Sequence, residues 1–432
     1  MIAIADIGAF GQQVRSIVLY RDVLEGKVGR AFLDLLQALS PDLMRSASLR
    51  EERVLVAYGD WIRALANCGM GWQEYLSDRI LKADNAFSQQ ASRVEFTEMP
   101  STLVAVAKRD LRILQLVYNT VCADIADWVQ DVLPNLYDLP IWYDDVQIDG
   151  GAVSAFQKWF EVKDWGDYTA QLAMQYARSG VGVFATFRAF RFVAGELVGI
   201  ANPDPIQADD LIGYSWQQET LIKNTQALLK GHPALHILLY GSRGSGKSSL
   251  IKALLHRSDA LRLIEVSKAE LSQLPELVEC LRDVPQKFII FVDDLSFEED
   301  DDAYKSLKVV LEGNVTARAQ NVVVYATSNR RHLIREFYGD RPRPKDADEI
   351  HNWDTVQEKL SFSDRFGMTL TFGPADQETY LEMVRHLFGQ SGLEMLPVEL
   401  DFEALQWATK HNGRSGRTAR QFVDFLVGNR SG

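Results

Sequence analysis

The chain has 432 residues, of which 47% are hydrophobic, 10% aromatic and 24% charged. This length suits two or three ordinary domains, and the composition excludes a largely disordered, collagen-like or low-complexity protein. The net charge of -13 argues against non-specific binding along nucleic acid or an anionic membrane surface. The three cysteines are far apart and indicate neither a disulfide framework nor a cysteine zinc site, as expected in a reducing compartment.

Targeting and membrane-spanning segments are not expected. The N-terminal run MIAIADIGAF has Asp6 inside its apolar stretch and no basic leader, so it does not resemble a signal peptide. The best candidate for a membrane span, residues 103–121, contains the charged residues Lys108, Arg109, Asp110 and Arg112. We therefore expect a cytoplasmic protein with no membrane partner.

Residues 1–182 are expected to form a mostly helical N-terminal domain, because apolar residues recur at spacings of three and four, most clearly in residues 103–128. Large aromatic rings at such spacing form either a core or a partner-binding face. We favour the core, because buried aromatic side chains commonly fill the interior of helical domains. Six of the nine tryptophans fall in this half: Trp61, Trp72, Trp128, Trp142, Trp159 and Trp165.

Residues 183–209 are expected to form a β-hairpin and a linker. The runs VFATFRAFRFV and LVGI flank a turn at residues 194–196. The segment NPDPIQADD that follows carries Pro203 and Pro205, which is typical of a connection between domains.

Strands and helices alternate from residue 210 onward. This alternation predicts an α/β domain with a parallel sheet over residues 210–374. A separate helical subdomain is expected over residues 375–432. The predicted strands are residues 236–240, 262–266, 288–292, 322–326 and 368–372.

The strongest motif is GSRGSGKS, which satisfies the phosphate-loop pattern and lies between a predicted strand and a predicted helix. Backbone N–H groups of such a loop surround phosphate oxygens, and the helix N-terminus adds positive potential. Lys247 is expected to reach the β- and γ-phosphates, and Ser248 to bind Mg²⁺. The predicted nucleotide-binding residues are Gly241, Ser242, Arg243, Gly244, Ser245, Gly246, Lys247, Ser248 and Ser249.

Two aspartates follow the predicted strand FIIFV. Asp293, at the strand end beside the phosphate loop, is expected to hold Mg²⁺ together with Ser248. Asp294 is expected to orient or deprotonate the attacking water. The acidic run at residues 298–302 is interpreted as a solvated loop.

Three further residues follow the phosphate loop in the chain and could complete a nucleotide site. Asn329 ends the fourth predicted strand, where it would meet the γ-phosphate. Arg365 in SDRFG and Arg417 in GRSGRTARQF carry the planar cation that suits phosphate oxygens. Alone, each would be an ordinary turn or surface residue.

Together these motifs resemble an AAA+ ATPase module over residues 210–430. The runs DDLSFEE, LEGN, YATSNRRHL, SDRFG and GRSGRTARQF resemble, more narrowly, a bacterial AAA+ family catalogued as domain of unknown function 815. The resemblance implies an AAA+ P-loop module: a five-stranded parallel sheet with helices on both faces, a helical lid, and ATP with Mg²⁺ at their junction. It also implies assembly into a ring or open spiral.

The resemblance also implies roles for single residues. Asn329 would be sensor 1, and Arg365 an arginine finger acting on ATP held by a neighbouring subunit. Arg417 would be sensor 2, with Arg420 as a rival one turn later. The adenine pocket would be lined by Leu211, Ile212 and Gly213.

Two departures from the family pattern shape the functional hypotheses. Asp294 stands where many AAA+ proteins have Glu, so hydrolysis could be slow or conditional on a partner. The segment EVSKAELSQLPEL contains no aromatic-hydrophobic-glycine pore loop, which argues against a processive unfoldase.

The leading hypothesis is an oligomeric Mg²⁺-dependent ATPase that remodels or loads a protein partner recognised by the N-terminal domain. The alternatives are a slow or non-hydrolysing ATP-dependent assembly switch and a helicase-loader-like accessory factor in DNA metabolism. The last draws on arginines around residues 338–357, although nucleic acid is not the favoured partner.

Overall fold

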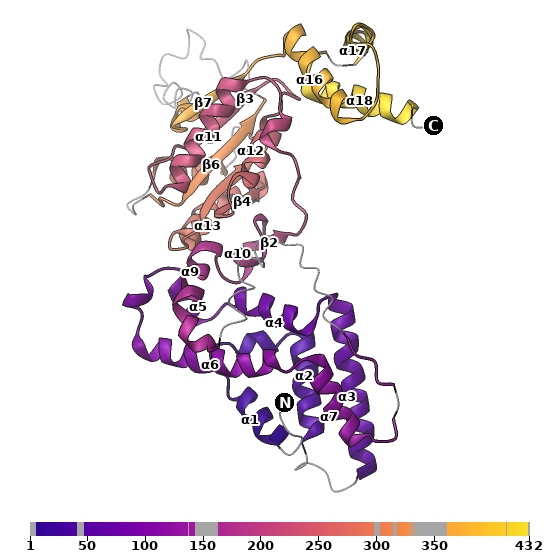
Figure 1. The fold of residues 1–432 in the computed structure, drawn as a ribbon. Coiled ribbons are helices and arrows are strands. Elements are labelled where there is room, and N and C mark those ends of the chain that lie inside the picture. The colour runs from indigo at the N-terminus through magenta and orange to yellow at the C-terminus, as the bar shows by residue number, and fades with distance from the viewer. Residues whose placement is uncertain are drawn as a thin grey trace. The chain divides into compact units, whose positions relative to one another are not determined.

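The chain divides into an N-terminal unit, Met1–Thr186, and a C-terminal unit, Phe187–Gly432. The computed structural model describes residues 6–40, 47–136, 138–142, 163–297, 303–313, 318–329, 333, 361–411 and 413–430. Figure 1 shows helices throughout the described part of the N-terminal unit, and a C-terminal unit in which helices surround a sheet.

The N-terminal unit is built from helices and short 3₁₀ turns, as its sequence periodicity predicts. The apolar pattern of residues 103–128 is divided between α6 and α7, because the chain turns at Thr120 and Val121. The helices are α1 (Ile7–Arg15), α2 (Lys27–Leu39), α3 (Ala47–Cys68), α4 (Trp72–Leu81), α5 (Ala86–Ala91), α6 (Ser101–Asn119), α7 (Cys122–Val132), α9 (Thr169–Ser179) and α10 (Val183–Thr186), with 3₁₀ turns η2 (Arg21–Leu24), η4 (Phe96–Glu98) and η5 (Trp165–Tyr168).

The tryptophans of this unit lie in its core, which confirms that interpretation for the described ones. Trp61 and Trp72 are fully buried and pack edge to face, with ring centroids 5.6 Å apart. Trp142 is partly buried against the same core. Trp128 and Trp165 are also buried, whereas Trp159 lies outside the described residues.

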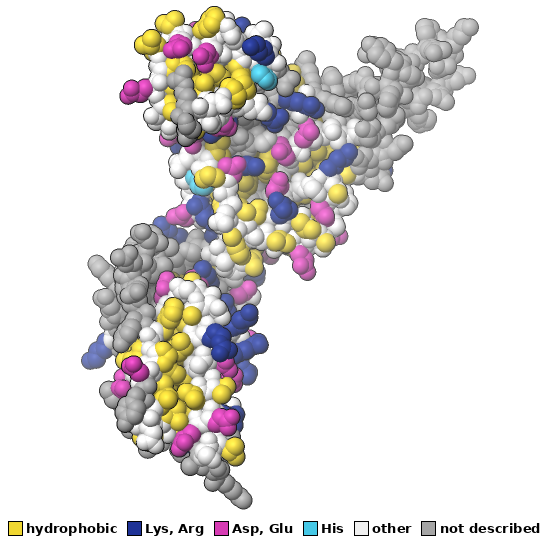
Figure 2. All heavy atoms as spheres, turned by 90° about the vertical axis from the view of Figure 1, so that its right-hand side faces the viewer, with side chains coloured by type: hydrophobic (Ala, Val, Ile, Leu, Met, Phe, Trp, Pro, Cys, Tyr) yellow, Lys and Arg dark blue, Asp and Glu magenta, His cyan; other side chains and the backbone are white. Residues whose placement is uncertain are grey.

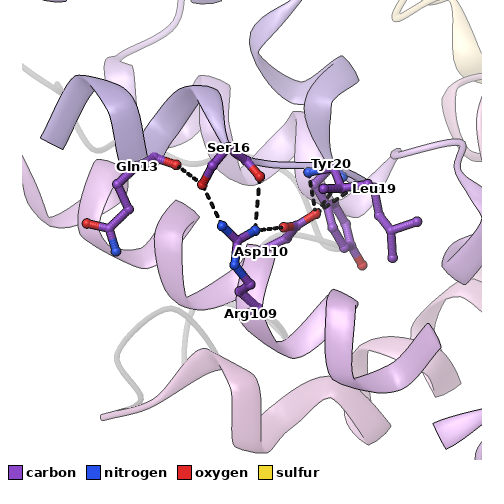
Figure 3. A network of polar contacts seen from close by, with 7 residues as sticks. Gln13, Ser16, Leu19, Tyr20, Arg109 and Asp110 are labelled. Carbon is purple, nitrogen blue, oxygen red and sulfur yellow. Dashed lines mark hydrogen bonds and ion pairs between the residues drawn. The ribbon is translucent and has the colours of Figure 1, made fainter. Parts of the chain in front are cut away.

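A buried carboxylate closes the connection between α1 and η2. Asp110 of α6 is fully buried, and its Oδ2 accepts hydrogen bonds from the backbone N–H groups of Val18 at 2.9 Å and Leu19 at 2.6 Å. Figure 3 shows Arg109 beside it, donating to Ser16 as well as to Asp110. The same oxygen also accepts from the buried N–H of Tyr20 at 3.4 Å, so the aspartate provides the acceptor for three consecutive backbone donors.

The C-terminal unit has a seven-stranded sheet in the order β2-β1-β4-β5-β6-β3-β7. The strands β3 to β7 form the expected parallel sheet, and the predicted hairpin adds two more strands because β1 pairs in parallel with β4. The hairpin begins later than predicted: Val183–Thr186 are the helix α10, and the first strand starts at Ala189. The strands are β1 (Ala189–Val193), β2 (Glu196–Ile200), β3 (Ile237–Gly241), β4 (Leu261–Val266), β5 (Lys287–Val292), β6 (Val322–Ser328) and β7 (Met368–Phe372).

The central strands of this sheet are apolar and buried on both faces. Ile237 and Leu239 of β3 pack with residues of α11 and α12 on one face. The side chain between them, Leu238, is equally buried, as expected for a parallel sheet covered on both sides. The helices are α11 (Ser215–Leu229), α12 (Lys247–Ala253), α13 (Leu274–Leu281) and α14 (Ala303–Glu312), with 3₁₀ turns η6 (Ala208–Asp210), η7 (Leu254–Arg257), η8 (Lys268–Gln273) and η10 (Ser361–Arg365).

Three C-terminal helices form the lid: α16 (Gln377–Gln390), α17 (Pro397–Lys410) and α18 (Gly416–Arg430). They share a hydrophobic core of their own, separate from the core of the sheet. The lid also exposes Leu396, Val398 and Phe402, and Figure 2 shows hydrophobic side chains on the lid face turned to the viewer. Within the described ranges, no helix combines the length and apolar character needed to cross a bilayer.

Candidate functional site

The phosphate loop joins β3 to α12, as its sequence predicts. Gly244 and Gly246 have φ angles of +75° and +86°, which residues with a side chain rarely adopt. A Cβ at Gly241 would lie 2.0 Å from the carbonyl oxygen of Phe372 in β7, and a Cβ at Gly244 would lie 2.9 Å from Ser415 Oγ of the lid. The glycines therefore allow the loop to run closely between the neighbouring strand and the lid.

Lys247 is held by the loop that precedes it. Its buried Nζ donates to the carbonyl oxygens of Gly241 and Ser242 at 2.9 and 2.8 Å, and to Asn329 Oδ1 at 3.2 Å. Burial lowers the pKa of Lys247, whereas Asp293 and Asp294 act in the opposite direction. An ammonium group bound by neutral oxygens can exchange them for phosphate oxygens, whose charge is a stronger partner.

The two predicted magnesium ligands are directly linked. Ser248 Oγ donates to Asp293 Oδ1 at 2.7 Å, and Thr327 Oγ1 at the end of β6 donates to the same oxygen at 2.5 Å. A hydroxyl and a carboxylate beside a phosphate loop are the donor types that Mg²⁺ uses in such sites, so the residues fit this metal. Thr327 had no signal in the sequence beyond its place in a buried strand.

Asp294 lies next to Asp293 in a constrained backbone conformation, with φ of 49°. Its backbone N–H donates to Thr327 Oγ1 at 2.9 Å, and its Oδ1 accepts from Asn329 Nδ2 at 2.7 Å. Because Asn329 also accepts from Lys247, its amide connects the carboxylate predicted to be catalytic with the ammonium predicted to bind phosphate.

Leu211 and Ile212, the residues expected beside the base, line the same cavity. Gln218 of α11, which sequence reasoning missed, donates to the carbonyl oxygens of Leu211 and Gly213, both at 2.7 Å. Gly213 does not line the cavity, and a Cβ at this position would be 2.7 Å from Thr379 Cγ2 of the lid. Gln218 thus fixes the shape of the segment that the resemblance assigns to adenine.

The lid contributes both candidate sensor arginines to the cavity, since Arg417 and Arg420 line it together. The backbone N–H of Arg417 donates to the Gly244 carbonyl oxygen at 3.3 Å. The start of α18 therefore rests directly on the phosphate loop, and the geometry does not separate the two arginines.

The resulting cavity has a volume of about 610 Å³, which is in the usual range for small-molecule sites. It lies between the C-terminal ends of the strands and the lid. The predicted residues that line it are Leu211, Ile212, Arg243, Gly244, Ser245, Gly246, Lys247, Ser248, Ser249, Asp293, Asp294, Asn329 and Arg417. Gly213, Gly241, Ser242 and Arg365 are not among the lining residues.

Arg365 stands at the other end of the sheet. It precedes β7, whose first residue, Met368, pairs with Ile237 at the start of β3, whereas Phe372 pairs with Gly241 at the phosphate loop. The side chain of Arg365 forms an ion pair with Glu312 of α14. The length of a strand thus separates Arg365 from the cavity of its own chain.

Two interpretations concern residues that the structure does not describe. The acidic run 298–302 and the arginine-rich stretch 338–357 lie outside the described residues. Both remain predictions.

Comparisons with known proteins agree with the position of the motifs. The model of a family described as "Protein of unknown function (DUF815)" matches residues 185–430, more than half of the chain. No curated protein matches the chain.

Among solved structures, the chain is similar to the Thermotoga maritima RuvB Holliday junction branch migration motor, with 15% identity and a TM-score of 0.36. The match covers 51% of this chain and 63% of RuvB, less than two thirds of that protein. It is also similar to the FIGL-1 AAA domain in complex with ADP, with 18% identity and a TM-score of 0.35, over 53% of this chain and 74% of that domain.

Proposed function

Because the chain belongs to the DUF815 family, whose description names no reaction, we propose from the site itself that it is an AAA+ ATPase that hydrolyses ATP with Mg²⁺. The observation that carries this proposal is that two hydrogen-bonded pairs, Lys247 with Asn329 and Ser248 with Asp293, lie beside the phosphate loop and line one cavity. The lining of the cavity around them also includes the apolar side chains of Leu211 and Ile212, which suit a base.

Each polar side chain has a task in this proposal. Lys247 and the loop N–H groups bind the β- and γ-phosphates, and Ser248 and Asp293 hold Mg²⁺. When bound, the metal neutralises charge on the phosphate oxygens. Asp294 orients the attacking water and accepts its proton. Asn329 forms hydrogen bonds with both Asp294 and Lys247 and so holds the two side chains in place relative to each other.

Assembly of several copies follows from the position of Arg365. An arginine at the far end of β7 serves a phosphate in another copy better than one in its own cavity. Leu396, Val398 and Phe402 of the lid supply exposed apolar surface of the kind that assembly covers. We therefore propose a homo-oligomer, a ring or an open spiral, in the cytoplasm.

The N-terminal unit is proposed to recognise a protein partner that the ATPase remodels or loads. Its described tryptophans are committed to its core, so recognition falls to other surface residues. The net charge of -13 argues against long, non-specific contact with nucleic acid.

A mixing experiment tests the shared site. Lys247→Ala destroys the phosphate site but leaves Arg365 intact, whereas Arg365→Ala does the reverse. Each variant alone is expected to lose turnover, by about 10³-fold or more for Arg365→Ala. A mixture of the two should regain Mg²⁺-dependent hydrolysis as total protein concentration rises, because some interfaces combine one intact site with one intact finger.

Two results would contradict the proposal. Full turnover by Arg365→Ala alone would exclude a catalytic finger. If the mixture shows no hydrolysis at concentrations where the unaltered chain is active, a site shared between copies is excluded.

An ATP-dependent assembly switch is the second candidate, and the state of Asp294 favours it. This carboxylate is one methylene shorter than Glu and is already engaged by Asn329 at 2.7 Å. If ATP drives assembly in sedimentation experiments while phosphate release equals that of Lys247→Ala, the switch replaces the hydrolysing machine.

A further inference from the structure

Arg365 already has an anionic partner within its own chain. It forms an ion pair with Glu312, and the two side chains are 20% and 42% exposed, respectively. Glu312 is the last residue of α14, and Arg365 the last residue of η10. The guanidinium of Arg365 is therefore largely shielded from water, whereas the carboxylate of Glu312 is partly exposed to it.

Packing holds the two elements that carry this pair together. Phe362 of η10 lies edge to face against Phe297 and Tyr304, with ring centroids 5.8 and 6.1 Å away. Tyr304 belongs to α14, so the aromatic cluster connects the helix that carries Glu312 with the turn that carries Arg365. The pairing is thus a consequence of the folded chain and needs no second copy.

The position of Glu312 is electrostatically unusual. The C-terminal end of a helix carries partial negative charge and favours a cation over a carboxylate. Gly313, with φ of +85°, ends α14 directly after Glu312. The guanidinium of Arg365 offsets both the carboxylate and the helix end, which explains why an acidic residue is tolerated there.

We propose that Glu312 is the resident counter-ion of Arg365 and regulates how readily this arginine engages the nucleotide phosphate of a second copy. The inference rests on the proposed function, since it requires Arg365 to act between copies. A terminal phosphate carries more charge than a carboxylate and competes for the same guanidinium donors. Glu312 therefore reduces productive contact at low protein concentration and gives way when the neighbouring site holds ATP.

The size of this effect follows from the exposure of the pair. Partly exposed ion pairs change an equilibrium by at most about fivefold. Glu312→Gln removes the charge but keeps the shape of the side chain. We expect it to lower the protein concentration that gives half-maximal hydrolysis per subunit by about two- to fivefold, with the plateau rate unchanged within twofold.

The experiment measures hydrolysis per subunit against protein concentration for the full chain and four variants. These are Glu312→Gln, Arg365→Ala, the double variant, and Glu279→Gln as matched control. Glu279 also pairs with an arginine, Arg282, at 2.9 Å, and the two side chains are 59% and 23% exposed. Sedimentation with a non-hydrolysable ATP analogue provides a second midpoint that does not depend on turnover.

The inference is supported if Glu312→Gln lowers both midpoints, Glu279→Gln lowers neither, and the double variant behaves like Arg365→Ala. An unchanged midpoint for Glu312→Gln, or a lower plateau rate, overturns the inference. If Arg365→Ala loses turnover in the same experiment, the proposed function still stands. Normal turnover by Arg365→Ala overturns the shared site and the inference together.

Discussion

The two units use polar side chains in different ways. In the N-terminal unit, Asp110 receives hydrogen bonds from consecutive backbone N–H groups, so it serves the fold of its own chain (Figure 3). In the C-terminal unit, Lys247 donates to Asn329 and to loop carbonyls, and Asp293 accepts from Ser248, all around a cavity. The first arrangement is complete without a ligand, whereas a ligand can replace partners in the second.

This difference separates stability from activity. A polar group that satisfies buried backbone donors should affect unfolding when it is removed. A polar group at the edge of a cavity should affect binding and turnover instead. Substitutions in the two units can therefore break or sharpen the comparison.

The largest effect is expected for Asp110→Ala. It leaves the N–H groups of Val18, Leu19 and Tyr20 without their acceptor, which should lower the free energy of unfolding of the N-terminal unit by about 3 kcal/mol or more. Chemical unfolding followed by tryptophan fluorescence measures this change, with the exposed Asp127→Ala as control. Hydrolysis by folded protein should stay within twofold, and a parallel loss of turnover would show that the network also serves activity.

A smaller effect is expected for Thr327→Val, which tests the cavity. Valine keeps the shape of threonine but removes the hydroxyl that donates to Asp293 and accepts from the N–H of Asp294. Groups that hold a metal ligand in place typically matter about 10-fold or more, so the Mg²⁺ concentration for half-maximal hydrolysis should rise by about tenfold. The control is Thr371→Val, at an exposed position of β7. If this variant raises the Mg²⁺ concentration for half-maximal hydrolysis by the same factor, Thr327 has no special role.

The smallest effect concerns His236, a buried group of the C-terminal unit that serves the fold rather than the cavity. Its Nδ1 accepts from the N–H of Val324 at 2.9 Å, and burial, helped by Arg318, lowers its pKa to about 3. Between this value and the ordinary pKa of 6.5, the unfolded chain binds a proton that the folded chain does not. Stability therefore falls as the pH decreases from 6.5 toward 3.

His236→Asn keeps an acceptor near the position of Nδ1 and removes the titration. Between pH 7.5 and 5.5 the unaltered chain should lose about 1 kcal/mol more stability than this variant. Urea unfolding at both pH values measures the difference. Identical losses would mean that His236 is not held neutral by its surroundings.

The sequence predicts the parts of the fold and site that depend on short patterns. The phosphate loop, the aspartates after β5 and Asn329 after β6 are each recognisable within a few residues. The parallel order of the strands brings their ends together, so Lys247, Asp293 and Asn329 meet as expected.

The remainder depends on contacts between distant segments. The pairing of β1 with β4 is not visible in the periodicity of either strand, so the hairpin could not be recognised as part of the sheet. Thr327 and Gln218 have ordinary surroundings in the sequence, and only their three-dimensional neighbours reveal their roles. The ion pair of Arg365 with Glu312 likewise joins residues whose proximity no local motif predicts.

The place of β1 in the chain matters for anything that the N-terminal unit holds. Helix α10 ends at Thr186 and β1 begins at Ala189, and the two residues between them pack within the C-terminal unit: Phe187 contacts Phe190, and Arg188 donates to the carbonyl oxygen of Ser258 at 2.8 Å. Because β1 pairs in parallel with β4, the chain passes from the last helix of the N-terminal unit directly into the sheet that carries the phosphate loop. A mechanical load on the N-terminal unit would therefore be borne by the hydrogen bonds of that sheet.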